Sequence, residues 1–123
     1  MGLRLLKIAV VYLLVGALFG LYMGVTQKFT LAPVHAHLLL LGWASLALAG
    51  LIYHLYPRAA ETGLARMHFW LHNLALPVFM ASLALLLGGS EAAGPVVAVS
   101  ASVVLLGLIA FVANVLVNVK ASA

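Results

Sequence analysis

The chain carries five histidines among 123 residues, of which 67% are hydrophobic and 7% are charged. It has no cysteine, which excludes disulfides, thiolate metal sites, iron–sulfur clusters and c-type haem attachment. The two carboxylates, Glu61 and Glu91, both fall in predicted loops. A histidine within an apolar membrane segment needs a hydrogen-bond partner or a metal. The histidines are therefore the candidate sites of any chemistry.

His35 and His37 stand two residues apart at the start of the second apolar run. A spacing of two places their side chains about 200° apart on a helix. They therefore point to nearly opposite faces, which disfavours chelation of one ion and favours two different partners. Haem suits such a pair, because its iron takes an axial imidazole on each face. The alternative interpretation is that these histidines bond to carbonyl groups near the membrane interface.

The other three histidines form a second group, at the opposite end of the predicted helices. His68 and His72 are four residues apart and share one helix face, about 40° from each other. His54 lies near the inner end of the preceding helix, at a similar predicted depth. Three imidazoles at one depth are typical of a zinc or copper site or of a proton-accepting patch. The alternative is that they cap helix ends beside Arg66.

Four apolar runs must position these side chains. They cover approximately residues 5–25, 31–56, 65–87 and 95–119. Each has the ~20 residues that a helix needs to cross a ~30 Å hydrocarbon core. The short polar breaks predict antiparallel neighbours. We therefore predict an all-α integral membrane four-helix bundle, a single domain over residues 1–123. The first run is too long for a signal peptide, and aromatic residues such as Trp43 and Tyr53 fit packing or interfacial roles.

The cations predict the orientation of the chain in its membrane. If the N-terminus faces inward, five cations lie inside and Lys28 alone lies outside; the five are Arg4, Lys7, Arg58, Arg66 and Lys120. This bias predicts cytoplasmic N- and C-termini, in a bacterial inner membrane or its equivalent. The scattered cations form no phosphate-binding face, which excludes a nucleic-acid partner. In the first run Gly16, Gly20 and Gly24 share one face and predict close packing against a helix of this or a neighbouring chain.

Two stretches form recognisable motifs. They are His35-Ala36-His37-Leu38 with Gly42-Trp43, Gly50-Leu51-Ile52-Tyr53 and Pro57, and His68-Phe69-Trp70-Leu71-His72-Asn73. The first resembles a haem-ligating helix of the haem-copper oxidase superfamily, as found in the catalytic subunit of cbb3-type oxidases and nitric oxide reductases. The second is similar to small four-helix relatives of that subunit. The resemblance covers the second and third runs and hardly extends to the first and fourth.

The family's catalytic subunit has twelve helices in three arcs of four, and a His-x-His pair on one helix serves two haems. The resemblance implies that this chain is one arc and that three copies form a homotrimer, with a dimer as the alternative. Each haem b would lie between subunits, with His35 from one and His37 from the next. Lys28 is the one cation on that side for the haem propionates. An isolated bundle that uses Met23 as the second ligand is a further alternative.

The sequence also departs from the family. It lacks the three-histidine copper site, and the histidine–glutamate iron site, that oxygen and nitric oxide reduction require. Two axial histidines leave no open position on haem iron. The resemblance therefore implies membrane electron transfer or haem-based sensing, with a quinol or a respiratory complex as partner, and the enzyme class stays open. Competing hypotheses are a copper- or zinc-binding protein that uses the inner histidines and a non-catalytic accessory subunit.

Overall fold

The computed structural model describes residues 1–121, and their regular structure is helical throughout. The elements are α1 (Gly2–Thr26), α2 (Ala32–His37), the π-helix η1 (Leu38–Ala44), α3 (Ser45–Leu55), α4 (Pro57–Ala60), α5 (Gly63–Leu87), the 3-10 turn η2 (Glu91–Ala93) and α6 (Gly94–Asn118). The segments α2, η1 and α3 follow one another without a break and are together called the second helix. The all-helical prediction is confirmed, and the four predicted runs agree with these bounds to within three residues.

Four helices are long and apolar enough to cross a membrane: Gly2–Thr26, Ala32–Leu55, Gly63–Leu87 and Glu91–Asn118. Their outward faces are apolar as well. Val25 is 76% exposed and Leu116 is 78% exposed. A helix with apolar residues all round is suited to a lipid environment rather than to water, so the fold fits a membrane protein.

Local signals fix the helix ends. Gln27 adopts a left-handed conformation (φ 54°) and ends α1, with its backbone N–H donating to the carbonyl of Met23. Pro33 lies in the first turn of α2, where a missing N–H costs nothing. The Thr62 hydroxyl accepts a hydrogen bond of 3.1 Å from the backbone N–H of Ala65 and so caps α5.

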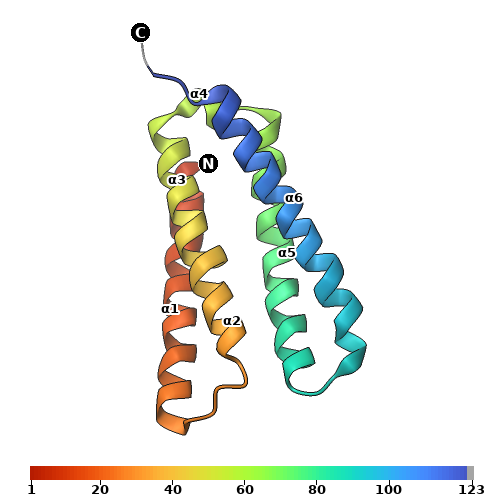
Figure 1. Ribbon diagram of the computed structural model, residues 1–123. Helices are drawn as coiled ribbons and strands as arrows, with labels where there is room; N and C mark the ends of the chain where they lie inside the picture. The colour runs from red at the N-terminus through yellow and green to blue at the C-terminus, as the bar shows by residue number, and fades with distance from the viewer. Residues whose placement is uncertain (122–123) are drawn as a thin grey trace.

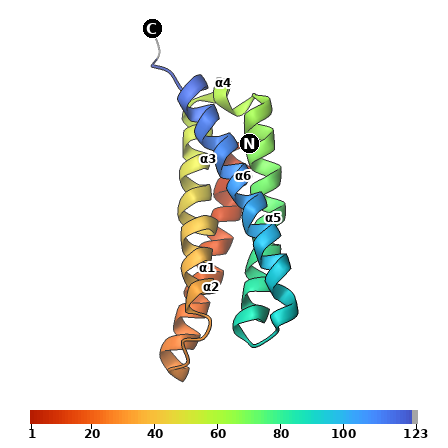
Figure 2. The same ribbon diagram turned by 45° about the vertical axis from the view of Figure 1, so that its right-hand side comes forward.

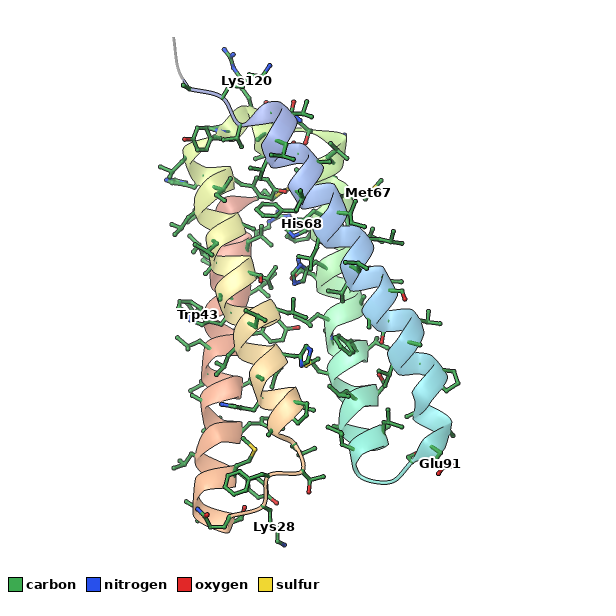
Figure 3. The ribbon with its side chains drawn as sticks, viewed as in Figure 1. Lys28, Trp43, Met67, His68, Glu91 and Lys120 are labelled. Atoms are coloured by element: carbon green, nitrogen blue, oxygen red, sulfur yellow. The ribbon has the colours of Figure 1, made fainter. Side chains whose placement is uncertain are left out.

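The four long helices form two antiparallel hairpins, α1 with the second helix and α5 with α6 (Figures 1 and 2). The hairpins come together at the end that holds α4 and both termini, and they diverge toward the opposite end (Figure 1). Lys120 lies at the terminal end and Lys28 at the opposite end (Figure 3). We call these the terminal end and the loop end.

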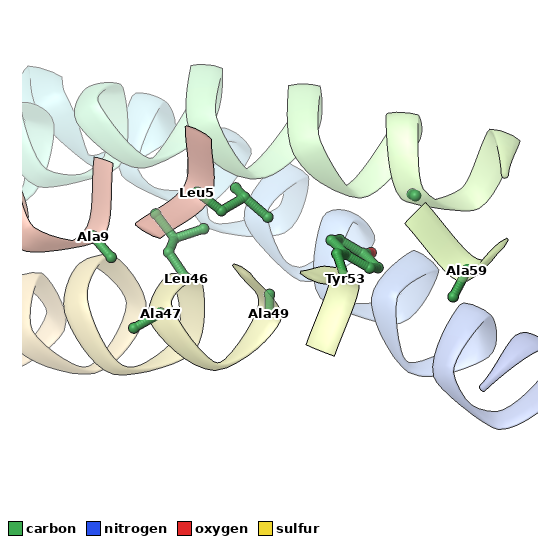
Figure 4. Packing of buried hydrophobic residues seen from close by; sticks show 8 residues of the cluster. Leu5, Ala9, Leu46, Ala47, Ala49, Tyr53 and Ala59 are labelled. Atoms are coloured by element: carbon green, nitrogen blue, oxygen red, sulfur yellow. The ribbon is translucent and has the colours of Figure 1, made fainter. Parts of the chain in front are cut away.

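Small residues allow α1 to approach the second helix closely. A Cβ atom on Gly50 would lie 2.8 Å from the carbonyl oxygen of Gly2, and one on Gly16 would lie 2.6 Å from the Leu39 side chain. Buried residues of both helices, such as Leu5 and Leu46, fill the contact (Figure 4). Gly16 and Gly20 of the predicted glycine face therefore pack against a helix of the same chain, whereas the prediction is wrong for Gly24, which is exposed. Close van der Waals contact of this kind holds membrane helices together.

Asn114 of α6 joins the hairpins at the terminal end and is fully buried. Its Nδ2 donates a 2.9 Å hydrogen bond to the carbonyl oxygen of Ala59 in α4. Its Oδ1 accepts from Nδ2 of Asn118 at 2.8 Å and lies 3.0 Å from the Thr62 hydroxyl. Hydrogen bonds between membrane helices contribute about 0.6 kcal/mol each on average. This cluster therefore stabilises the junction where the hairpins meet.

Candidate functional site

His35 is half-buried and faces α1. Its Nδ1 lies 2.8 Å from the carbonyl oxygen of Gly16. Because a carbonyl can only accept, Nδ1 carries the hydrogen, and the neutral ring keeps its lone pair on Nε2. The ring lies against Gly20, where a Cβ atom would be 2.9 Å from the Cε1 atom of His35. The glycine face of α1 thus provides both the room and the hydrogen-bond acceptor for this imidazole.

His37 is also half-buried, but it lies toward the other hairpin. Its Nδ1 is 2.6 Å from the carbonyl oxygen of Pro33, one turn earlier in the helix. Its ring meets Phe79 of α5 edge-on, with ring centroids 5.4 Å apart at 73°. The two histidines therefore contact different helices, as their spacing predicts. Both neutral rings hold the hydrogen on Nδ1 and keep the lone pair on Nε2.

Lys28 is exposed in the loop that connects α1 to α2 at the loop end. It borders a largely apolar cavity of about 560 Å³ between this loop and α5. The other lining residues are Tyr22, Thr30, Leu31, Ala81, Ala84, Leu85 and Gly88. The histidine pair does not line this cavity. The sulfur-bearing Met23 is buried near the end of α1, with its carbonyl bonded to the backbone of Gln27.

The inner histidines His68 and His72 are almost completely buried, at 1% and 0% exposure. They lie on α5, and His68 is visible between the hairpins in Figure 3. Nε2 of His68 is 3.3 Å from Nδ1 of His72. Nδ1 of His68 is 3.1 Å from the Tyr53 hydroxyl, and Nε2 of His72 is 2.9 Å from the carbonyl oxygen of Leu41. Four groups from two helices thus form one buried chain of hydrogen bonds.

The Leu41 carbonyl fixes the direction of every bond in this chain. Since a carbonyl cannot donate, Nε2 of His72 carries a hydrogen and, in the neutral ring, Nδ1 accepts. Nε2 of His68 must then donate to His72, and its Nδ1 accepts from the Tyr53 hydroxyl. Both rings are in the Nε2–H form, the opposite of the form held at His35 and His37.

His54 does not belong to this cluster. It is exposed on α3, while its neighbour Tyr53 points inward to His68. The expectation that His54, His68 and His72 lie together is therefore wrong for His54, because adjacent residues on a helix face directions about 100° apart. Within residues 1–121, no three histidine or carboxylate side chains are grouped so as to hold a metal ion.

Two members of the buried chain were not expected from the sequence. Tyr53 fits a packing role there, whereas its hydroxyl is the donor to His68. The adjacency of Tyr53 and His54 could have indicated this, because only one of two adjacent helical residues can face the neighbouring hairpin. Nothing in the sequence predicts that the Leu41 carbonyl accepts a hydrogen bond from a side chain, since this depends on the π-helix.

Comparisons with known protein families, with curated proteins and with solved structures find no match. The function is therefore inferred from the hydrogen bonds and contacts of the two histidine groups.

Proposed function

We propose that the chain is a haem b-binding membrane protein that transfers electrons, with His35 and His37 as axial ligands. One observation carries this proposal: both imidazoles donate Nδ1–H to a backbone carbonyl and leave Nε2 free. Metal-bound histidines usually have this arrangement, in which the second nitrogen bonds to a carbonyl or carboxylate. The carbonyl fixes the orientation of the ring and makes Nε2 a better ligand.

The proposed haem sites lie between subunits. Within the chain, His35 packs on α1 and His37 meets Phe79 of α5, so the two rings lie on different faces of the second helix. We propose that each ring binds a different haem, and that each haem is shared with a neighbouring subunit. Haem iron takes an imidazole on each face. A closed ring, in which His35 of one subunit and His37 of the next share a haem, gives every subunit the same environment. We favour the homotrimer that the resemblance to one arc of a haem-copper oxidase implies.

Haem iron, when bound, supplies one-electron redox chemistry. The two histidines would occupy both axial positions, which favours electron transfer over reduction of a gas. The Gly16 and Pro33 carbonyls keep the two rings in the ligating form. Lys28 would neutralise propionate charge at the loop end. We further propose cytoplasmic termini, a bacterial inner membrane and a quinol or respiratory complex as the electron donor.

An optical spectrum of the detergent-purified protein tests the proposal. We expect a Soret band and, after reduction with dithionite, the α and β bands of a bis-histidine haem. His35→Ala and His37→Ala should each remove most of the haem. His54→Ala is the matched control, because His54 is exposed and takes part in no side-chain hydrogen bond within residues 1–121. Purified protein without a Soret band, when grown with ample haem, would refute the proposal.

Co-expression of two single variants tests whether the site is shared. Neither His35→Ala nor His37→Ala alone can build a site. In a mixed oligomer with equal amounts of both, about one quarter of the interfaces would pair an intact His35 with an intact His37. Partial recovery of haem in the mixture therefore indicates sharing between subunits. No recovery, with mixed oligomers verified by two affinity tags, would point to a site within one chain.

The alternative of copper or zinc on the inner histidines has weaker support. The Tyr53 hydroxyl lies at Nδ1 of His68, whereas His72 lies at its Nε2. Three donors thus fail to converge on one point, which a stable zinc site requires. Metal analysis of the wild type and His72→Ala would detect such a site. An accessory subunit without a cofactor would show neither haem nor metal.

A further inference from the structure

A π-helical turn separates His35 and His37, here called the outer histidines, from the rest of the second helix. It spans Leu38–Ala44. In an α-helix, the N–H of Ser45 would donate to the carbonyl of Leu41, four residues earlier. Here it donates to the carbonyl of Leu40, five residues earlier. Leu41 therefore loses its α-helical donor at the place where the helix widens. Wide turns of this kind are rare and occur frequently at functional sites.

His72 supplies the missing donor. Its Nε2 lies 2.9 Å from the Leu41 carbonyl oxygen, and its side chain is fully buried. A backbone carbonyl in a membrane interior has no water to replace a lost partner, and an unsatisfied group is costly there. Gly107 of α6 brings that helix against this part of α5, since its Cβ would lie 3.1 Å from the backbone nitrogen of His72. The packing of α6 against α5 therefore holds His72 in place.

The remaining members of the chain keep His72 in its donating form. His68 donates to Nδ1 of His72, which places the hydrogen of the neutral ring on Nε2. The Tyr53 hydroxyl fixes the form of His68 in the same way. The chain therefore selects the one tautomer that can serve the Leu41 carbonyl.

The π-turn determines where the outer histidines point. It accommodates one residue more than an α-helix of the same length, so the segment before it is turned by roughly 100° relative to the segment after it. That turn allows His35 to reach the Gly16 carbonyl and His37 to reach Phe79. Without it, the outer segment would face other neighbours.

We propose that His72 is a positioning residue: its hydrogen bond to Leu41 holds the π-turn that aims His35 and His37 at their partners. The statement about ligands rests on the proposed haem function, whereas the statement about the turn does not. A group on one hairpin therefore controls the rotation of a segment on the other. The inner histidines then support the outer pair and need no metal of their own.

Spin-label distances test the turn without haem. The chain has no cysteine, so Leu21→Cys and Ala36→Cys, both at exposed positions, give one label on α1 and one on α2. If the turn reverts, Ala36 rotates by roughly 100°, which moves a side chain at ~5 Å radius by about 8 Å relative to α1. We expect such a shift in His72→Leu. His72→Gln keeps an N–H donor and should retain the wild-type distance, as should the control His54→Leu.

The outcomes separate the hypotheses. A wild-type distance in His72→Leu, or the same shift in His72→Gln as in His72→Leu, would overturn the proposal. If His72→Leu fails to fold, it is remade with Leu40 deleted, which removes the extra residue and the need for the donor. Folding of that protein supports the proposal, and its failure to fold overturns it. Haem spectra of the same variants test the proposed function independently of the distances. A wild-type protein without haem would refute the proposed function and leave the proposal about the π-turn standing.

Discussion

Gly20→Ala offers a direct test of how α1 supports the outer histidines. The added methyl group would lie 2.9 Å from Cε1 of His35. This is about 0.6–1 Å inside the ~3.5–4.0 Å at which carbon atoms make contact. The imidazole must therefore move by that amount. Gly24→Ala is the matched control on the same face, because among residues 1–121 no atom beyond its chain neighbours and its own helix backbone lies within 4 Å of the new Cβ.

The expected effect on stability is small and the expected effect on haem is large. A shift of this size lengthens the 2.8 Å bond from His35 to the Gly16 carbonyl to about 3.5 Å, where an N–H···O hydrogen bond is lost. The half-buried ring can move toward the surface, so we expect the free energy of unfolding to fall by only about 1 kcal/mol, which is small for an overpacked site. Loss of the group that orients a metal-bound histidine typically reduces affinity about 10- to 100-fold.

Haem titration of the two purified variants, followed at the Soret band, measures the affinities, and unfolding in denaturing detergent measures the stability. We expect Gly20→Ala to bind haem more weakly than Gly24→Ala and to unfold almost as the wild type does. Equal haem affinity in the two variants would refute the assignment of His35 as a ligand held by α1. A large loss of stability with unchanged affinity would show that the glycine serves packing alone.

Gly42→Ala should destabilise the chain by about 1–3 kcal/mol in the same unfolding assay, because its Cβ would overlap Cγ of Tyr12, the ring atom bonded to Cβ of the tyrosine. Asn114→Leu should cost about 1 kcal/mol, since it removes the two hydrogen bonds that join α6 to Thr62 and Ala59. Asn73→Leu should be neutral or stabilising, because the buried Oδ1 of Asn73 lacks a partner among the described residues. Lys28→Ala should weaken haem binding by less than about tenfold in the titration, as expected for an exposed charge.

Gly94→Ala is the control for Gly42→Ala, because among the described residues its Cβ would meet no atom within 4 Å beyond its chain neighbours and its own helix backbone. A Gly42→Ala chain as stable as Gly94→Ala would contradict the packing of Tyr12 on the π-helix. An Asn114→Leu protein as stable as Asn73→Leu would show that the junction does not depend on its hydrogen bonds. A complete loss of haem in Lys28→Ala would contradict a role limited to neutralising the propionate charge.

The sequence by itself determined the helices and the positions of the outer histidines on them. An apolar run of about twenty residues that crosses a lipid bilayer forms a helix, because the helix pairs every backbone N–H and C=O group within the segment. The spacing of His35 and His37 placed them on opposite faces, because the rotation per residue is a property of the helix alone. Lys28 and Lys120 lie at opposite ends of the bundle (Figure 3). The sequence predicts this too, because three antiparallel helices separate the two residues along the chain.

Only the tertiary structure decided which groups meet the histidines. The π-turn depends on whether a donor from another helix can satisfy the Leu41 carbonyl, and that donor, His72, is thirty-one residues away. The exclusion of His54 in favour of Tyr53 follows from the rotation of α3 against α5. Helical periodicity fixes the faces within one helix, but the rotation of one helix against another depends on side-chain packing across the contact.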